Sequence, residues 1–364
     1  MSLGCLDSVL SIFRVLSCKR ETGYEALTEA TSACQPACEP YEYEPLPGDE
    51  YTRLLEFQPG RGIISCKLLP VSIENARGTY EAISYVWGDA ADTIDITCDG
   101  MLLSITQNLG DVLRRIRGGQ EPRLLWADAI CINQNDKKEQ GHQVERMGRI
   151  YENASRVLIW IGKDDGAARR LLKMPFVPQN GGRLPEDTRV WNSVRNLTEH
   201  AWFGRVWVLQ EVGLAASALF LYGDFWMDWC ELAKFILLTS LHSELAHYTN
   251  PDVSQRFTQT YHSLWKAYSN PTSWRAELTS ITKGFLDNQV AYIDILENGR
   301  RYQTTDPRDH VYAFLGHPAA RLQDGRQIVT VDYKKSVDDV YFETARAMIE
   351  NGPHPWMVLA TVNH

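Results

Sequence analysis

The sequence has 364 residues, of which 44% are apolar, and this is enough material for one large domain or for two domains with a sizeable core. The net charge is −9, with 37 basic residues against 46 acidic residues and no basic stripe, which argues against nucleic-acid binding. Eight widely spaced cysteines without a zinc-binding pattern indicate reduced thiols in a cytoplasmic protein that has no metal site.

The first 50 residues are expected to lie outside the folded core. Leu3 to Cys18 is apolar but too short to span a bilayer, and no basic segment precedes it. A short helix or a poorly ordered terminus is favoured over an amphipathic membrane contact with Cys5 or Cys18 acylated. Residues 19–50 are rich in Glu, Pro, Thr and Ser, so we expect a linker there.

From Tyr51 onward the pattern predicts a β-rich entry. Short strands are expected at residues 51–57, 63–69 and 80–86. Asp99-Gly100 separates two alternating segments and is a strong hairpin signal. A helix from Leu109 to Ile116 follows, with Thr106 as its N-cap.

Leu124 to Gly162 has the pattern of a strand, a helix and a second strand. Residues 124–130 form a nearly continuous apolar run, typical of a strand covered on both faces, with Asp128 as the one acid within it. Asp136 opens an amphipathic helix, and residues 157–162 return as the second strand. Units of this length form right-handed crossovers between parallel strands.

The rest of the chain is expected to be a variable loop at residues 163–190, a helical region at 190–214, a strand at 218–222 and mainly helices beyond. One of these helices follows a capping pattern that begins at Ser336. We therefore divide the chain into an N-terminal segment and linker (1–50), an α/β domain (51–225) and a helical C-terminal extension (226–364).

Candidate functional residues lie near the carboxyl ends of the predicted strands, the edge at which open α/β sheets bind ligands. Phosphate-loop, dinucleotide-binding, hydrolase-elbow and zinc-protease signatures are absent from the sequence. The candidates are acids, amides and aromatic residues: Trp87, Asp89, Asp128, Asn133, Gln134, Trp207 and Glu211.

Two interpretations of Glu211 stay open on residue type alone. Apolar neighbours could raise its pKa or make it a desolvated carboxylate that stabilises an oxocarbenium-like centre, as in glycosidic cleavage. Alternatively it caps a helix or pairs with Arg205. Structural interpretations are also open for the other candidates: Asp128 as a loop anchor, the two amides as partners of turn backbone, and Trp87 as a core residue. We expect Arg308 and Asp309 to form a local ion pair at a helix start.

Taken together, the motifs resemble the fungal heterokaryon-incompatibility (HET) domain. The resemblance rests on five ordered blocks: YEAISYVWGD (80–89), LWADAICINQN (125–135), WFGRVWVLQE (202–211), DPRDHVYAFLG (306–316) and VDYKKS (331–336). It implies a role in non-self recognition between fungal cells, with the domain triggering programmed cell death.

HET domains are in turn distantly similar to TIR domains, which have a flavodoxin-like parallel sheet and in some members cleave NAD. TIR domains carry a Trp-x-x-x-Glu motif with a catalytic Glu, and Trp207 and Glu211 have the same spacing. The resemblance therefore implies an α/β fold of TIR/flavodoxin type with a β-hairpin insertion. It also implies Glu211 as the catalytic residue, a pocket shaped by Trp87, Asp128 and Asn133, NAD as the substrate, and no cofactor.

Two departures from the family pattern bear on activity. Family members commonly continue past the end of this sequence with a Trp-Pro-Asp-Trp-like block, so we expect a short or truncated member. Ala127 replaces a larger residue in the central motif and could loosen packing, so we expect activity to be impaired or differently controlled. The alternative to an enzyme is a signalling module that self-associates or recruits protein partners through the helix from Asp136 to Ala154. A nucleotide-responsive receptor is the weakest interpretation.

Overall fold

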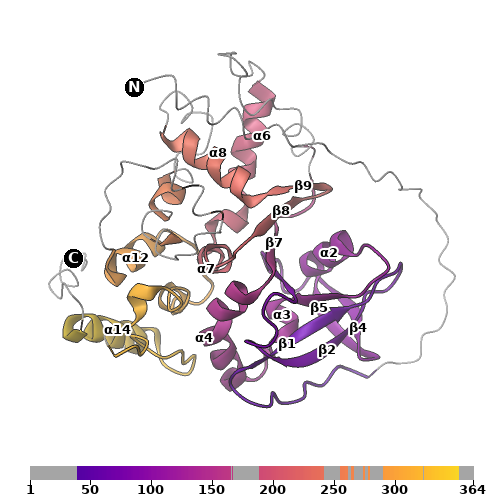
Figure 1. Cartoon of the computed structure of the whole chain (residues 1–364), viewed down its shortest axis with the longest axis horizontal. Coiled ribbons are helices and arrows are strands. Elements are labelled where there is room, and N and C mark those ends of the chain that lie inside the picture. The colour runs from indigo at the N-terminus through magenta and orange to yellow at the C-terminus, as the bar shows by residue number, and fades with distance from the viewer. Residues whose placement is uncertain are drawn as a thin grey trace.

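A computed structural model shows an α/β protein built around one mixed sheet (Figure 1). The structure describes residues 39–164, 166, 188–241, 255–260, 264–265, 274, 278, 290–322 and 324–351. The predicted N-terminal helix with Cys5 and Cys18, most of the predicted linker and most of the predicted variable loop lie outside these residues.

The described part of the chain contains a nine-stranded sheet with the order β5-β4-β2-β1-β6-β3-β7-β8-β9. The strands are β1 (Tyr51–Phe57), β2 (Ser65–Ser72), β3 (Glu81–Tyr85), β4 (Thr93–Cys98), β5 (Met101–Thr106), β6 (Arg123–Trp126), β7 (Arg156–Trp160), β8 (Ala218–Tyr222) and β9 (Phe225–Asp228). The helices are α2 (Gln107–Ile116), α3 (Asp128–Cys131), α4 (Lys137–Asn153), α6 (Thr188–Thr198), α7 (Val208–Gly213), α8 (Trp229–Leu241), α12 (Tyr292–Gly299), α13 (Asp309–Tyr312) and α14 (Val337–Asn351). The short 3-10 turns are η2 (Ala201–Gly204) and η4 (Pro318–Ala320).

The β-rich entry confirms the predicted strands and hairpin. β1 and β2 pair antiparallel, and β1 continues the sheet by pairing antiparallel with β6. β4 and β5 pair across the Asp99-Gly100 turn, where φ is +50° at Asp99 and +83° at Gly100. Positive φ at both central residues is the geometry that a two-residue hairpin of this type requires, and glycine adopts it without a steric cost.

The centre of the sheet is parallel and buried. β6, β3, β7 and β8 run parallel in that spatial order, so that numbering them along the chain gives the order 2-1-3-4. Residues 82–85 of β3 and 157–160 of β7 are all buried, as expected for strands with both faces covered. β6 and β7 are parallel, as predicted, but they are not neighbours, because β3 lies between them.

The predicted strand at residues 124–130 is too long. β6 ends at Trp126, and Asp128 begins the short helix α3, whose last residue is Cys131. An apolar run does not by itself separate a buried strand from a buried helical turn. The consequence is that Asp128 stands after the strand and not within it.

The two helices of the amino-terminal half have the predicted caps. The Thr106 side chain accepts a hydrogen bond from the Leu109 N–H at the start of α2, and Asp136 accepts from Lys138 N–H and Glu139 N–H at the start of α4. Such caps satisfy backbone donors that have no partner inside the helix.

The carboxyl-terminal half packs against the α/β half. In Figure 1, α12 and α14 are drawn on the side of α4 and α7 that is away from β1 and β2. Gly148 on α4 lies so close to Gly316 that a Cβ added to Gly148 would stand 3.5 Å from the Gly316 Cα. The sheet itself continues past the predicted boundary at residue 225, since β9 ends at Asp228 and pairs with β8.

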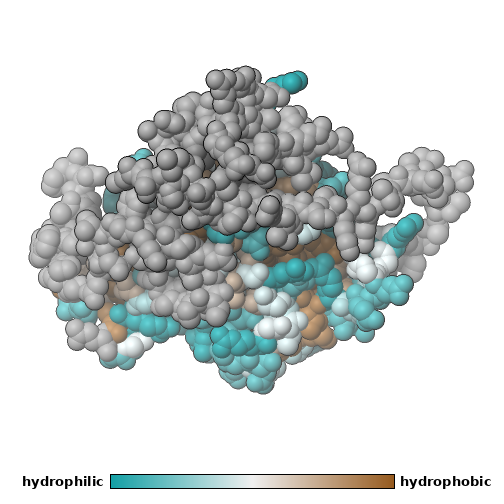
Figure 2. Space-filling model, turned by 45° about the horizontal axis from the view of Figure 1, so that its top comes forward, coloured by the Kyte–Doolittle hydropathy of each residue, from teal (hydrophilic) through white to brown (hydrophobic). Residues whose placement is uncertain are grey.

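The described surface is mainly hydrophilic on the face that Figure 2 shows. Large apolar side chains that are exposed, among them Ile63, Trp226 and Phe342, come from separate parts of the chain. Among the described residues, none of the helices is both long and apolar enough to cross a membrane.

Candidate functional site

The polar candidates gather where β3 and β6 end, next to the helix that carries Glu211. Trp87 follows β3 by two residues, Asp128 follows β6 by two residues, and Glu211 lies on α7. α7 packs against both β3 and α4. The fold therefore brings together residues that are up to 124 positions apart, as the distance in sequence from Trp87 to Glu211 shows.

Glu211 is the most buried acid of this group, with 2% of its surface exposed. The Ser84 hydroxyl on β3 donates a hydrogen bond of 2.5 Å to Glu211 Oε2. The Trp202 indole N–H in turn donates to Ser84 Oγ at 2.9 Å. The Arg205 guanidinium lies 4.0 Å from Glu211 Oε1 and donates to the Tyr85 carbonyl.

Burial favours the neutral form of the Glu211 carboxyl. Desolvation, with a smaller contribution from the Asp128 charge, raises the pKa of Glu211 to about 7, while Arg205 and the Ser84 hydrogen bond act in the opposite direction. Both interpretations drawn from the sequence are thus partly realised. The pKa of Glu211 is raised, as the first interpretation expected, and Glu211 lies near Arg205, as the second expected.

Asp128, Trp87 and Gln134 form one connected group. Trp87 is 40% exposed, and its indole N–H donates to Asp128 Oδ2 at 2.8 Å. Asp128 Oδ1 accepts from the Ala129 N–H at 2.8 Å, and its carbonyl accepts from the Gln134 amide at 2.9 Å. Trp87 is therefore not a core residue. It is an exposed aromatic ring whose orientation is fixed by a nearly buried carboxylate.

Asp89 and Asn133 do not join Glu211. The exposed Asp89 side chain accepts from the Ala91 N–H at 2.9 Å, and Asn133 Oδ1 accepts from the Asn135 N–H at 3.1 Å. Both make the local turn contacts that short polar side chains favour. In the structure these two side chains therefore contact their own loops and not Glu211.

Trp207 also differs from expectation, because its indole N–H is directed to a residue outside the group. It donates to Asp309 Oδ2 at 3.0 Å. The expected ion pair between Arg308 and Asp309 is wrong: Arg308 pairs with Asp306 at 2.6 Å, and Asp309 is buried and accepts hydrogen bonds from neutral donors. The pairing of Arg308 with Asp306 is bidentate, a geometry that the guanidinium favours.

Several polar residues at this edge were not among the candidates predicted from the sequence. Ser84 is the polar residue in an otherwise apolar run on β3, and this was the available signal. Asn108 at the start of α2 donates to the Val86 carbonyl at 2.5 Å and accepts from the Trp160 indole at 2.9 Å, which joins the ends of β3 and β7. Nothing in the local sequence around Asn108 indicated that contact.

A small cavity beside α7 is lined mainly by aromatic residues. Its lining consists of Trp202, Phe203, Val208, Leu209, Trp229, Arg256, Phe257, Trp265 and Tyr302. Among the described residues its lining holds no carboxylate, and Glu211 is not part of it. In the described part of the chain no group of His, Cys, Asp and Glu side chains has the geometry to hold a metal ion.

Comparison with known proteins agrees with the blocks that meet in this fold. Residues 80–211 match the family model described as heterokaryon incompatibility protein (HET). This stretch is a HET domain match. It begins at Tyr80, just before β3, and ends at Glu211, so the matched range includes the whole parallel core except β8.

One curated relative is heterokaryon incompatibility protein 6, OR allele, of Neurospora crassa. It is 29% identical over 197 aligned residues, which cover 40% of this chain and 29% of the relative. The chain thus matches less than a third of that protein's length. No solved structure matches the chain. The blocks at residues 306–316 and 331–336 lie beyond the range of the HET match.

Proposed function

We propose that this protein acts in fungal heterokaryon incompatibility as an effector of cell death, and that its HET region (residues 80–211) cleaves the nicotinamide–ribose bond of NAD. The HET match and the incompatibility relative support the role in incompatibility. The observation that carries the chemistry is the buried Glu211 carboxyl, held by Ser84 beside Asp128 and Arg205.

The arrangement of the parallel strands supports a ligand site at this edge. Their order, 2-1-3-4, equals the first four positions of the flavodoxin-like order 2-1-3-4-5, the topology proposed for TIR domains. Ligands in such sheets bind outside the carboxyl ends of the strands, where the strand order reverses. That point lies here between β3 and β7, beside Trp87, Asn108 and Arg205.

The chemistry assigned to Glu211 is stabilisation of positive charge. When the bond between the ribose C1′ and the nicotinamide nitrogen breaks, its electron pair leaves with nicotinamide, and the ribose acquires oxocarbenium character. An ionised Glu211 stabilises that centre until water adds at C1′ and releases a proton. Trp87, with its indole fixed on Asp128, offers an exposed aromatic face for a flat, cationic ring.

The burial of Glu211 sets a condition on this reaction. With 2% of its surface exposed, Glu211 meets a substrate only after the strand edge opens. This condition suits a death effector, which must be silent until a partner or a second copy triggers it. NAD is a substrate in this proposal, and the protein residues act without a cofactor.

The first prediction concerns turnover and its pH dependence. The concentrated wild-type protein, incubated with NAD, releases nicotinamide, and kcat/KM rises with pH through about 7 because the ionised Glu211 is the active form. Glu211→Gln, which keeps the side-chain shape, loses at least about a hundredfold of this activity. Asp89→Asn, at an exposed candidate outside the group, is the matched control. NAD cleavage by a folded Glu211→Gln protein at the wild-type rate contradicts the proposal.

The second candidate function is a non-enzymatic signalling module, and the closed position of Glu211 is the observation that favours it. The surface proposed for it on α4 is narrower than the sequence indicated. Gly141, Val144, Met147 and Gly148 are buried, and the exposed α4 side chains are those of Lys137, Lys138, Arg149 and Glu152.

Cell killing separates the two candidates. If the module acts by self-association or partner recruitment, killing survives Glu211→Ala and is lost when Lys138 and Arg149 are replaced by Glu. If the module acts by NAD cleavage, the outcomes reverse. Lys138 and Arg149 are exposed, so the protein with both residues replaced by Glu should keep its fold.

A further inference from the structure

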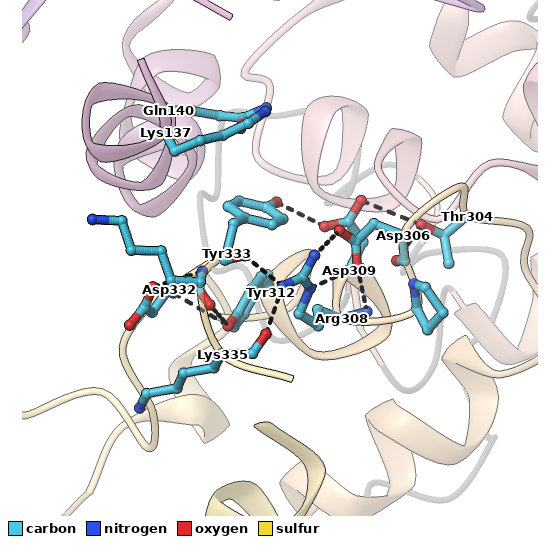
Figure 3. Close-up of polar contacts among 12 residues, drawn as sticks. Lys137, Gln140, Thr304, Asp306, Arg308, Asp309, Tyr312, Asp332, Tyr333 and Lys335 are labelled. Carbon is cyan, nitrogen blue, oxygen red and sulfur yellow. Dashed lines mark hydrogen bonds and ion pairs between the residues drawn. The ribbon is translucent and has the colours of Figure 1, made fainter. Parts of the chain in front are cut away.

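A second buried carboxylate, Asp309, lies at the centre of a polar cluster that the proposed chemistry does not use (Figure 3). Asp309 is 8% exposed, and its two oxygens accept three hydrogen bonds from uncharged donors. Tyr333 donates to Oδ1 at 2.7 Å, while Thr304 and Trp207 donate to Oδ2 at 3.2 and 3.0 Å. A buried carboxylate with this many directed donors fixes their relative positions.

The residues next to Asp309 hold its loop in place. Arg308 pairs with Asp306 and donates to the carbonyls of Tyr333 and Lys335, each at 2.6 Å. Figure 3 shows Tyr333 directed toward Asp309 and Arg308 between Asp306 and the Tyr333–Lys335 segment. This network joins two blocks of the carboxyl-terminal half, residues 304–312 and 332–335, into one support.

One of the three donors comes from the HET region. Trp207 is the N-cap residue of α7, and Glu211 lies four residues further along the same helix. The bond from Trp207 to Asp309 therefore ties the start of the Glu211 helix to the carboxyl-terminal half. Two further hydrogen bonds join α7 to the carboxyl-terminal half. The Gly316 N–H donates to Gln210 Oε1 at 3.2 Å, and the Trp265 indole donates to the Leu209 carbonyl at 2.7 Å.

α7 is thus held from both sides. On the side that faces β3, Ser84 binds the Glu211 carboxyl. On the side that faces the carboxyl-terminal half, Asp309 binds the Trp207 indole. A helix of six residues has too few internal hydrogen bonds to keep its place without such tertiary contacts.

We propose that Asp309, acting through Trp207, is a positioning residue that sets how deeply Glu211 sits against β3. The carboxyl-terminal half is in this way part of the candidate site, although none of its residues belongs to the HET match. The consequence for activity rests on the proposed function of Glu211, whereas the consequence for the position of Glu211 does not.

The ionisation of Glu211 reports its depth. The titratable or charged groups that face it are Arg205 before α7, Asp128 on α3, Tyr85 on β3 and Tyr151 on α4. None of the four takes part in the hydrogen bond between Trp207 and Asp309. If α7 loosens and water reaches the carboxyl, the pKa of Glu211 falls from about 7 toward its usual value of 4.5.

The test is a titration of the whole 364-residue chain with ¹³C-labelled glutamate carboxyl groups, in which Glu211 is the signal missing from Glu211→Gln. Trp207→Phe removes the indole donor and keeps an aromatic ring. We expect this variant and Asp309→Asn to lower the titration midpoint of Glu211 by about one pH unit or more. Asp324→Asn is the matched control, because it makes the same change at an exposed carboxylate that pairs with Arg326 and has no contact with the Asp309 network, and the Glu211 midpoint in it stays at the wild-type value.

A wild-type midpoint in folded Trp207→Phe and Asp309→Asn overturns the proposal, as does an equal shift in Asp324→Asn. If Asp309→Asn does not fold, Tyr333→Phe replaces it, since that variant removes one hydroxyl donor to Asp309 and should shift the midpoint in the same direction. NAD cleavage is measured in parallel, and the rise of kcat/KM with pH is expected to move to lower pH together with the Glu211 midpoint, because the ionised carboxyl is the active form. Absence of cleavage by the wild type refutes the proposed function alone, because the titration still decides the position of Glu211.

Discussion

The fold holds the Glu211 carboxyl in place and also makes its charged form costly. The Ser84 hydrogen bond and the nearby Arg205 favour the charged form, yet desolvation outweighs them and the pKa rises to about 7. If the ionised carboxylate stabilises a cationic centre in the reaction, its burial lowers the stability of the folded protein for the benefit of activity.

Removing the charge should therefore stabilise the protein at high pH. Because the folded-state pKa of Glu211 is raised above its usual value of 4.5, its contribution to stability is complete below about pH 4.5 and is lost as pH rises through 7. We expect the unfolding free energy of the wild type, relative to Glu211→Gln, to fall by roughly 3 kcal/mol over this window. Denaturant unfolding of both proteins between pH 4.5 and 8 measures it.

Asp306 provides a control of opposite sign. Its hydrogen bonds with Arg308 lower its pKa, so its contribution is present above the unfolded pKa and is lost as pH falls. The wild type should thus become less stable relative to Asp306→Asn as the pH decreases. A flat difference between the wild type and Glu211→Gln would show that Glu211 is hydrated in solution.

At the scale of elements, a buried ion pair holds α3 and its loop at the site edge. Arg53 on β1 donates to both carboxylate oxygens of Glu139 on α4, at 2.6 and 3.0 Å, and to the Cys131 carbonyl at 3.2 Å. Glu139 Oε1 also accepts from the Asn133 N–H at 2.8 Å. Arg53 and Glu139 thereby hold the segment that carries Asp128 and Gln134 through the backbone of Cys131 and Asn133.

Breaking this pair from one side should be costly. Arg53→Met leaves Glu139 nearly buried without its cation, and we expect a loss of about 3 to 5 kcal/mol in unfolding free energy. Arg149→Met is the matched control, since the Arg149–Glu74 pair is about half exposed on both sides and should contribute less than about 1 kcal/mol. Denaturant unfolding compares the two variants, and equal small effects would contradict a buried, structural pair.

At the scale of the whole molecule, the two halves meet at glycines. A Cβ added to Gly316 would lie 2.5 Å from Gln210 Oε1 on α7, and one added to Gly148 would lie 3.2 Å from the Leu214 side chain. The close approach of α4, α7 and the segment after α13 depends on these small residues.

Enlarging one of them should loosen the joint. We expect Gly316→Ala to destabilise the protein by about 1 to 3 kcal/mol, because Gln210 must leave its place and with it the hydrogen bond from the Gly316 N–H. Thermal unfolding measures the effect. Gly325→Ala is not a suitable control because φ is +85° there, whereas Gly118→Ala, with open space around its Cβ, should change stability little.

Local patterns predicted most of the amino-terminal half. The hairpin at Asp99-Gly100, the caps at Thr106 and Asp136, and the buried strand β7 follow from turn chemistry, capping and apolar runs, all of which act over a few residues. The same signals gave the wrong element at Asp128, because an apolar run looks the same whether it continues as a strand or turns into a short helix.

The sequence by itself determined the positions of the strands other than β9, the caps and the similarity of residues 80–211 to the HET family. Only the tertiary structure decided which side chains meet: Glu211 with Ser84, Trp87 with Asp128, and Trp207 with Asp309, while Asp89 and Asn133 contact their own loops. The physical reason is that strand order and helix packing bring together residues far apart in the chain, and no local pattern encodes which buried donor will face which buried acid.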